Sequence, residues 1–280
     1  MQRIYTTPGG EVYTLFTDAL SKEHILIAGT TGCGKSTVMN GLIATILHRA
    51  PGPEEGNAQM ILIDPKRVEL CAYKDMPHTL AHVGGQNCAG FAGALKMACD
   101  IMDLRYSELE RSGAREYKGG NIYVIIDEWA SLYSKYNPNR GECITALLRL
   151  TSEGRAARVH VILATQSPKA NILPTEIRDN FTCRFALMTQ SRTQTAFSLT
   201  VPPGELSCEN FPRPKDAGYA LGWYVLPGNE KKLYKMPHVT EEELTEIVTH
   251  WRNQNKTAPY AQDNTRKKRS IWAAIKRIRT

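Results

Sequence analysis

Residues 29 to 36 read Gly-Thr-Thr-Gly-Cys-Gly-Lys-Ser and directly follow the apolar run Ile25-Leu26-Ile27-Ala28. They fit the pattern G-x-x-x-x-G-K-[ST], in which glycines let the backbone curl so that its N–H groups face the phosphates of a nucleoside triphosphate. The following run through Leu47 suits a helix whose N-terminus faces those phosphates. This order of strand, loop and helix predicts nucleotide binding by Gly29, Thr30, Thr31, Gly32, Cys33, Gly34, Lys35, Ser36 and Thr37, with Lys35 on the phosphates and Ser36 on Mg²⁺.

A second acidic element lies downstream. The apolar run Tyr123-Val124-Ile125-Ile126 is typical of a buried parallel strand, and the acidic pair Asp127-Glu128 follows it. Such a pair is a Walker B element, in which Asp127 holds the Mg²⁺ shell and Glu128 orients and polarises a water for attack on the γ-phosphate. The second carboxylate favours hydrolysis over nucleotide binding alone. The sequence therefore predicts an ATPase whose cofactors are ATP and Mg²⁺.

Apolar and turn-rich segments alternate along the chain in a way that favours an α/β fold with a mainly parallel sheet covered by helices on both faces. After Thr189 the alternation ends, and two aromatic-rich runs flank Pro227-Gly228-Asn229, which predicts a hairpin at the edge of the sheet. Strands are expected near 24–29, 59–64, 122–127, 159–165 and 182–188, helices near 35–49, 90–112, 141–154, 174–179 and 241–251, and hairpin strands over 218–226 and 232–236.

The formal net charge of +7 belongs entirely to the C-terminal tail, where residues 265–280 carry seven lysines and arginines and no acid. We expect an ATPase domain over 1–253, followed by a linker and a basic amphipathic tail over 254–280. The tail is suited to DNA phosphates, to an anionic membrane surface or to a partner such as a relaxase or membrane channel component, and a frayed terminus is the alternative. Its candidate DNA contacts are Arg266, Lys267, Lys268 and Arg269.

The chain has no run of 18 apolar residues, and its first residues lack the apolar core of a signal peptide. We therefore expect a cytoplasmic protein that is at most peripheral at a membrane. Its seven cysteines form no C-x-x-C pair, so most are expected to be small core residues. Cys33 is the exception, because its place in the phosphate loop suggests an ATPase sensitive to thiol reagents.

Several further segments resemble the motor domain of the FtsK/SpoIIIE family of DNA translocases. Ile63-Asp64-Pro65-Lys66 follows the second strand, Gly154-Arg155-Ala156-Ala157 precedes the fourth, and Leu163-Ala164-Thr165-Gln166 ends it. The resemblance implies a RecA-like P-loop NTPase core of the ASCE type, which assembles as a homohexamer and threads double-stranded DNA by ATP hydrolysis. It also implies that Gln166 senses the γ-phosphate and that Arg155 reaches the nucleotide of a neighbouring subunit, with Arg184 as a second candidate. An arginine on a solvated helix end is the alternative for Arg155.

The chain also departs from the family pattern. Ser167 stands where the family usually has arginine, and Arg158 where it usually has glycine. We expect a minimal, stand-alone motor of the kind found in conjugative elements, plasmids or phages, since no membrane-spanning N-terminal region or winged-helix domain is recognisable. Candidate DNA contacts are Lys169 and Arg178 in and after the loop that follows the fourth strand, with residues 137–140 as a second segment; ordinary solvated loops are the alternative.

These patterns together predict an ATP-driven double-stranded DNA translocase that acts in DNA transfer or mobilisation. One alternative is an ATPase of the same family that drives protein secretion, which suits a body without net charge. Another is a nucleotide-switched protein that recruits partners with negligible turnover, against which the pair Asp127-Glu128 argues.

Overall fold

The computed structural model describes residues 22–49, 58–166 and 168–237, and of the following segment residues 241, 242, 244–246, 248 and 249. The basic tail, including Arg266 to Arg269, and Ser167 lie outside the described residues. Among the described residues, no helix has the length and apolar character needed to cross a membrane.

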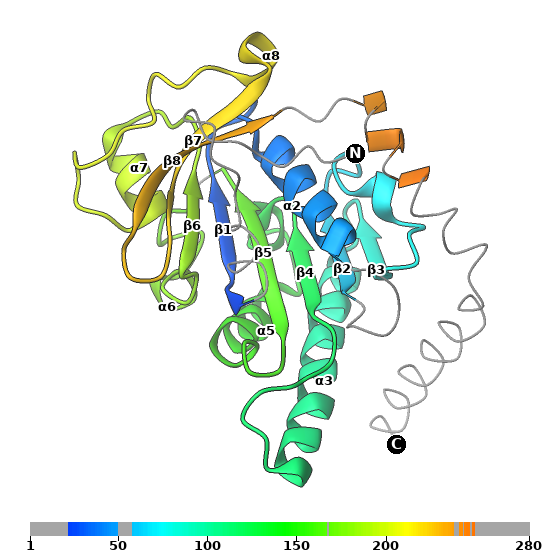
Figure 1. Cartoon of the computed structure of the whole chain (residues 1–280). Coiled ribbons are helices and arrows are strands. Elements are labelled where there is room, and N and C mark those ends of the chain that lie inside the picture. The colour runs from blue at the N-terminus through cyan, green and yellow to red at the C-terminus, as the bar shows by residue number, and fades with distance from the viewer. Residues whose placement is uncertain are drawn as a thin grey trace.

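An eight-stranded sheet forms the centre of the described chain, in the order β3-β2-β4-β5-β1-β6-β7-β8 (Figure 1). From β3 to β6 neighbouring strands are parallel, whereas β6–β7 and β7–β8 are antiparallel. The strands are β1 Ile25–Ala28, β2 Gln59–Asp64, β3 Thr79–Gly84, β4 Ile122–Ile126, β5 Val159–Thr165, β6 Cys183–Ala186, β7 Tyr219–Val225 and β8 Lys231–Pro237. The mainly parallel sheet and its edge hairpin are therefore confirmed.

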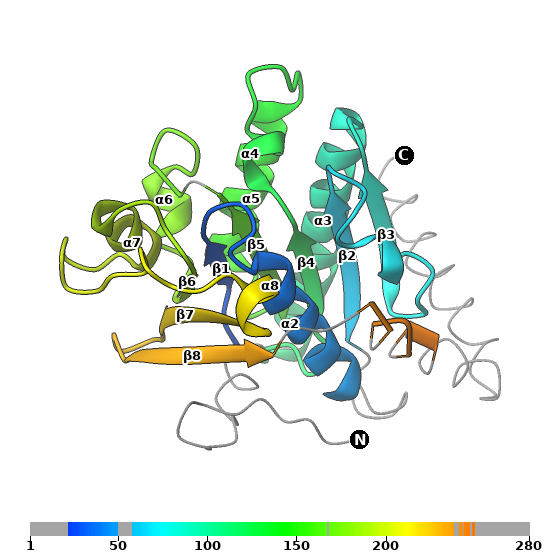
Figure 2. The ribbon, with the colours of Figure 1, turned by 90° about the horizontal axis from the view of Figure 1, so that it is seen from above.

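Helices cover both faces of this sheet (Figure 2). Alternate residues of the central strands face opposite sides, so Ile25 and Ile27 pack with α2 while Leu26 packs with α3 and α5. Both sides of β1 are thus apolar, as a buried parallel strand requires. The helices are α2 Lys35–Arg49, α3 Cys88–Ser112, α4 Trp129–Leu132, α5 Arg140–Glu153, α6 Thr175–Arg178, α7 Arg192–Leu199 and α8 Pro214–Ala217, with a 3₁₀ turn η1 at Cys71–Tyr73.

The sequence missed two larger elements. Strand β3 is an edge strand with only Thr79 fully buried, and its run Thr-Leu-Ala-His-Val-Gly has no continuous apolar character. Helix α7 is polar and rich in threonine, and it begins where the Ser191 side chain accepts a hydrogen bond from the backbone N–H of Gln194 at 3.1 Å. Cap chemistry and sheet pairing, rather than apolar periodicity, define these two elements.

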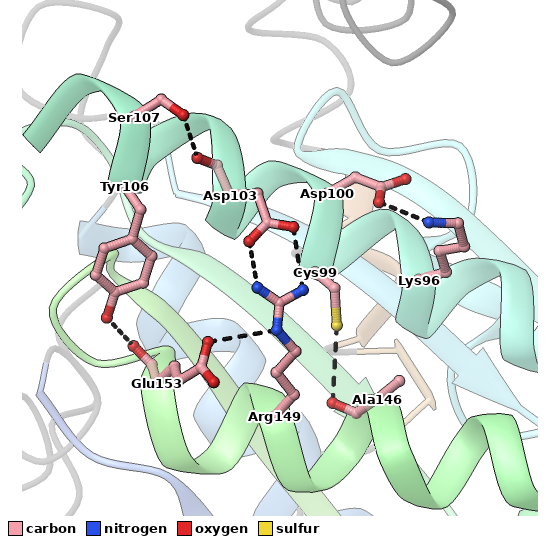
Figure 3. Close-up of polar contacts among 9 residues, drawn as sticks. All are labelled: Lys96, Cys99, Asp100, Asp103, Tyr106, Ser107, Ala146, Arg149 and Glu153. Carbon is pink, nitrogen blue, oxygen red and sulfur yellow. Dashed lines mark hydrogen bonds and ion pairs between the residues drawn. The ribbon is translucent and has the colours of Figure 1, made fainter. Parts of the chain in front are cut away.

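Helices α3 and α5 are joined by polar contacts on their outer side (Figure 3). The guanidinium of Arg149 donates to both carboxylate oxygens of Asp103, one at 3.0 Å, and its Nε lies 3.3 Å from Glu153 Oε2. Arg149 and Asp103 keep 40% and 46% of their side chains exposed, so solvent screens this pair. Leu147 of α5 is fully buried, in an apolar cluster that also contains residues of α3.

We expect the apolar contact to stabilise this helix pair more than the ion pair does. Arg149→Met should lower the free energy of unfolding by less than about 1 kcal/mol, whereas Leu147→Ala should lower it by about 2–5 kcal/mol. Urea unfolding of both variants measures the difference. A loss from Arg149→Met as large as that from Leu147→Ala would contradict this ranking.

Candidate nucleotide-binding site

The loop between β1 and α2 has the backbone shape that a phosphate cradle needs. Gly32 and Gly34 adopt φ values of +74° and +101°, which side-chain-bearing residues rarely adopt. A Cβ on Gly34 would lie 2.6 Å from Ala220 Cβ and 2.7 Å from Pro214 Cγ, so α8 and β7 press directly on the loop. Glycine is therefore required at residue 34 by conformation and by packing.

The Lys35 ammonium is turned into this loop. Its Nζ donates to the backbone carbonyls of Gly29 at 2.8 Å and Thr30 at 2.9 Å, and the residue is only 9% exposed. Neutral carbonyls compensate a buried cation only in part, and anionic oxygens would do so more strongly. The site thus suits a phosphate ligand.

The acidic pair lies at the carboxyl end of β4. Asp127 and Glu128 are each 4% exposed, and the intervening strand β5 separates β4 from β1. Burial raises the pKa of Asp127 to about 7, although the nearby Lys66 ammonium lowers it. Asp127 Oδ2 is buried with no hydrogen-bond partner among the described residues. A buried carboxylate oxygen without a donor fits a divalent cation held by Asp127 and Ser36.

Glu128 is held by a network of donors. Gln166, which follows β5, donates its Nε2 to Glu128 Oε2 at 2.8 Å and its backbone N–H to Oε1 at 3.3 Å. The Thr31 hydroxyl of the phosphate loop donates to Gln166 Oε1 at 3.0 Å. Gln166 therefore connects the phosphate loop to the acidic pair, and its role as a γ-phosphate sensor stays a prediction.

The Cys33 side chain is buried within the phosphate loop and is not exposed on its surface. The residue is 1% exposed, and its Sγ would be 2.5 Å from a Cβ on Gly29. Burial raises the pKa of the Cys33 thiol, which keeps it in the unreactive protonated form. In the described conformation the structure therefore argues against the predicted sensitivity to thiol reagents.

The two candidate arginines differ in exposure. Arg155 precedes β5, at the opposite end of that strand from Gln166, and its side chain is 53% exposed with an ion pair to Glu23 Oε2 at 3.5 Å. Arg184 is 12% exposed and donates to the carbonyls of Leu199 and Arg178. Of these two arginines, Arg155 is the one that is accessible to a neighbouring molecule.

The candidate DNA contacts also differ in how exposed they are. Lys169 is exposed, but Arg178 is 8% exposed, and its Nε and Nη1 are buried without hydrogen-bond partners. Its interior position does not suit a DNA contact, and the prediction for Arg178 is not supported. In the loop between α4 and α5, Tyr136 is 82% exposed, with the Lys135 ammonium 5.1 Å from its ring centre.

Two contacts near the site were not predicted from the sequence. Lys66 was part of a motif, but its contact with Glu128, at 3.4 Å between Nζ and Oε2, was not predicted. Arg213 lies at the start of α8, and its Nη1 is 3.9 Å from where a Cβ on Gly32 would be. Nothing local in the sequence joins residue 213 to residue 32, so only the fold reveals this approach.

Fold and site together define a P-loop ATPase-type domain, with a phosphate loop after β1 and an acidic pair after a strand two places away in the sheet. Residues 8–130 match the model of the FtsK/SpoIIIE family. A DNA translocase FtsK of Streptomyces coelicolor is 34% identical over 255 residues, which are 82% of this chain and 26% of that protein. The chain belongs to the FtsK/SpoIIIE family, and it spans about a quarter of the length of the curated relatives it matches.

Solved structures share this fold at low sequence identity. The conjugation coupling protein TcpA of pCW3, in its monomer form with ATPγS, has a TM-score of 0.68 and 19% identity, covering 88% of this chain and 69% of that chain. The cytoplasmic domain of the Type VII Secretion ATPase EccC of Thermomonospora curvata has a TM-score of 0.64 and 18% identity, covering 89% of this chain and 30% of that chain. These likenesses show the fold alone.

The raised pKa of Asp127 predicts a pH-dependent effect on stability. Because the folded chain favours the protonated carboxyl, its contribution to stability is fully present below the ordinary pKa of aspartic acid, near 3.9, and is lost as the pH rises through about 7. Asp127→Asn should therefore raise the free energy of unfolding of the nucleotide-free chain more at pH 8 than at pH 5.

Urea unfolding at the two pH values measures this, with Asp75→Asn, at an exposed aspartate, as the matched control. An equal effect of Asp127→Asn at both pH values would show that burial does not strain this carboxylate.

Proposed function

We propose that this chain hydrolyses ATP in the presence of Mg²⁺ and uses the energy to move along double-stranded DNA. The observation that carries the hydrolytic part is the network around Glu128, a buried carboxylate joined through Gln166 to the phosphate loop. A protein that only bound nucleotide would have no need of a second buried acid beside Asp127, whose burial costs free energy. This argues against the nucleotide-switched binding protein.

Each side chain has a part in this proposal. Lys35 leaves the carbonyls of Gly29 and Thr30 to bind the phosphates, and the backbone N–H groups of the loop orient them. Ser36 and Asp127 would hold Mg²⁺, which when bound neutralises phosphate charge. Glu128 accepts a proton from the attacking water at a carboxylate oxygen, while Gln166 keeps that carboxylate close to the phosphate loop.

The proposed cargo is supported by the relatives and by the surface. DNA translocases are the named relatives with more than 30% identity, whereas the secretion ATPase shares only the fold. Exposed cations and an aromatic ring are available on two loops of the described chain, at Lys169 and at the Lys135–Tyr136 pair. Such groups suit contacts with a DNA backbone.

Duplex DNA should therefore stimulate the steady-state ATPase rate, and more strongly than single-stranded DNA. Glu128→Gln should lower kcat by about 100-fold or more, because it removes the proton acceptor. The matched control is Glu142→Gln, which neutralises an exposed acid at the start of α5. Turnover that depends on Glu128 but ignores DNA would contradict the proposed cargo and favour a protein substrate.

We further propose that copies of this chain form a ring, as a hexamer, in which Arg155 of one subunit completes the site of the next. Its exposure and its place at the opposite end of β5 from Gln166 support this, since a trans arginine must be accessible from outside. A role of this ring in DNA transfer or mobilisation, with a relaxase or channel component as partner, stays a prediction.

Mixing two inactive variants tests the trans arrangement. Arg155→Ala and Lys35→Ala should each abolish most of the DNA-stimulated activity, but their mixture should regain part of it, because some interfaces then combine an intact Lys35 with an intact Arg155. Arg158→Ala is the control, at an arginine that instead pairs with Glu116. A mixture as inactive as its components would place Arg155 outside the neighbouring site.

A further inference from the structure

Lys66 lies on a tightly fixed turn after β2. The backbone N–H of Arg67 donates to the Asp64 carbonyl at 3.1 Å, and the Leu70 N–H donates to Asp64 Oδ2 at 2.9 Å. Arg67 itself has a φ of 59°, in the left-handed region that few side-chain-bearing residues adopt. A turn with two such hydrogen bonds restrains the backbone from which the Lys66 side chain extends.

The Lys66 ammonium faces the buried acidic pair from one side and solvent from the other. Its side chain is 47% exposed, whereas that of Glu128 is 5% exposed. Glu128 Oε2 receives two donors, Lys66 Nζ at 3.4 Å and Gln166 Nε2 at 2.8 Å, and Oε1 receives the Gln166 N–H at 3.3 Å. Both oxygens of the proposed proton acceptor are therefore already engaged by protein donors.

This arrangement restrains Glu128 through the positions that its donors occupy. The two donors on Oε2 fill the positions from which this oxygen would accept a water proton. Gln166 connects Glu128 to the phosphate loop and belongs to the site, so Lys66 is the donor whose removal opens one acceptor position on Oε2.

We propose that Lys66 is a positioning residue that holds Glu128 in a restrained state, and that a phosphate of the DNA duplex releases it by drawing the ammonium toward solvent. The inference rests on the proposed function and adds to it the step by which DNA raises turnover. A phosphate carries a full negative charge and competes directly with Glu128 for the exposed ammonium. Once the DNA phosphate has bound the Lys66 ammonium, Gln166 Nε2 remains as the donor to Glu128 Oε2.

The terminal phosphate of the bound nucleotide has the same chemistry and is the competing source of release. It is present in every turnover, with or without DNA, so it would leave no restraint for DNA to remove. Turnover in the absence of DNA therefore separates the two sources.

The test compares Lys66→Met and Lys66→Gln with Lys66→Arg, which keeps the charge. The matched control is Lys74→Met, at an exposed lysine at the end of η1. Measurements are kcat and KM with and without duplex DNA, and the affinity for a fluorescent ATPγS analogue. We expect both neutral variants to raise kcat without DNA on the order of fivefold, the effect of losing a half-exposed ion pair. DNA stimulation should shrink by the same factor, with nucleotide affinity unchanged, while Lys66→Arg and Lys74→Met resemble the parent.

A kcat without DNA that stays equal or falls in both neutral variants would overturn the inference, as would Lys66→Arg behaving like Lys66→Met. The proposed function fails separately, because it requires Glu128→Gln to be inactive whatever Lys66 does. An inactive Glu128→Gln, together with neutral Lys66 variants whose kcat without DNA is not raised, would thus refute the restraint by Lys66 and leave the proposed ATPase activity in place.

Discussion

Two carboxylates buried side by side at the end of an apolar sheet are the constraint around which this site is arranged. Burying an ionised acid is costly unless charges and donors compensate it. Glu128 has such compensation from Gln166 and Lys66, whereas Asp127 Oδ2 has no hydrogen-bond donor among the described residues, and burial raises the pKa of Asp127 to about 7. The site thus holds one acid in place and leaves the other ready for a cation.

The order of the strands explains how these groups meet. Because β4, β5 and β1 are parallel neighbours, the residues that follow them gather at one edge of the sheet. The phosphate loop, Gln166 and the acidic pair come from those three ends, and Lys66 comes from the end of β2 beside them. The hairpin then brings α8 onto the phosphate loop, where Pro214 and Ala220 leave room only for glycine at residue 34.

Sequence reasoning succeeded where a local pattern has a local cause. The glycine spacing of residues 29–36 and the apolar run before Asp127 each predict the local backbone conformation. The structure has the expected strand, loop and helix there. It failed where the cause is distant. The polar edge strand β3 depends on pairing with β2, and the burial of Arg178 depends on packing that the residue type opposes.

The contacts of Lys66 and Arg213 show the same limit at the site. The chain separation between Lys66 and Glu128 is 62 residues, and no periodicity encodes an ion pair across it. Arg213 approaches Gly32 only because the hairpin folds back over the loop. The spacing of residues in the sequence can therefore identify the nucleotide-binding residues. The groups that contact Glu128 are identified only when the order of the strands in the sheet is known.

The most direct measurement is the distance between Lys66 Nζ and Glu128 Oε2 in an experimentally determined complex of the chain with ATPγS, Mg²⁺ and duplex DNA. The account predicts that Lys35 then contacts phosphate oxygens and that the Lys66–Glu128 pair has separated beyond the ion-pair range of about 4 Å. A pair still at 3.4 Å with nucleotide and DNA in place would contradict it.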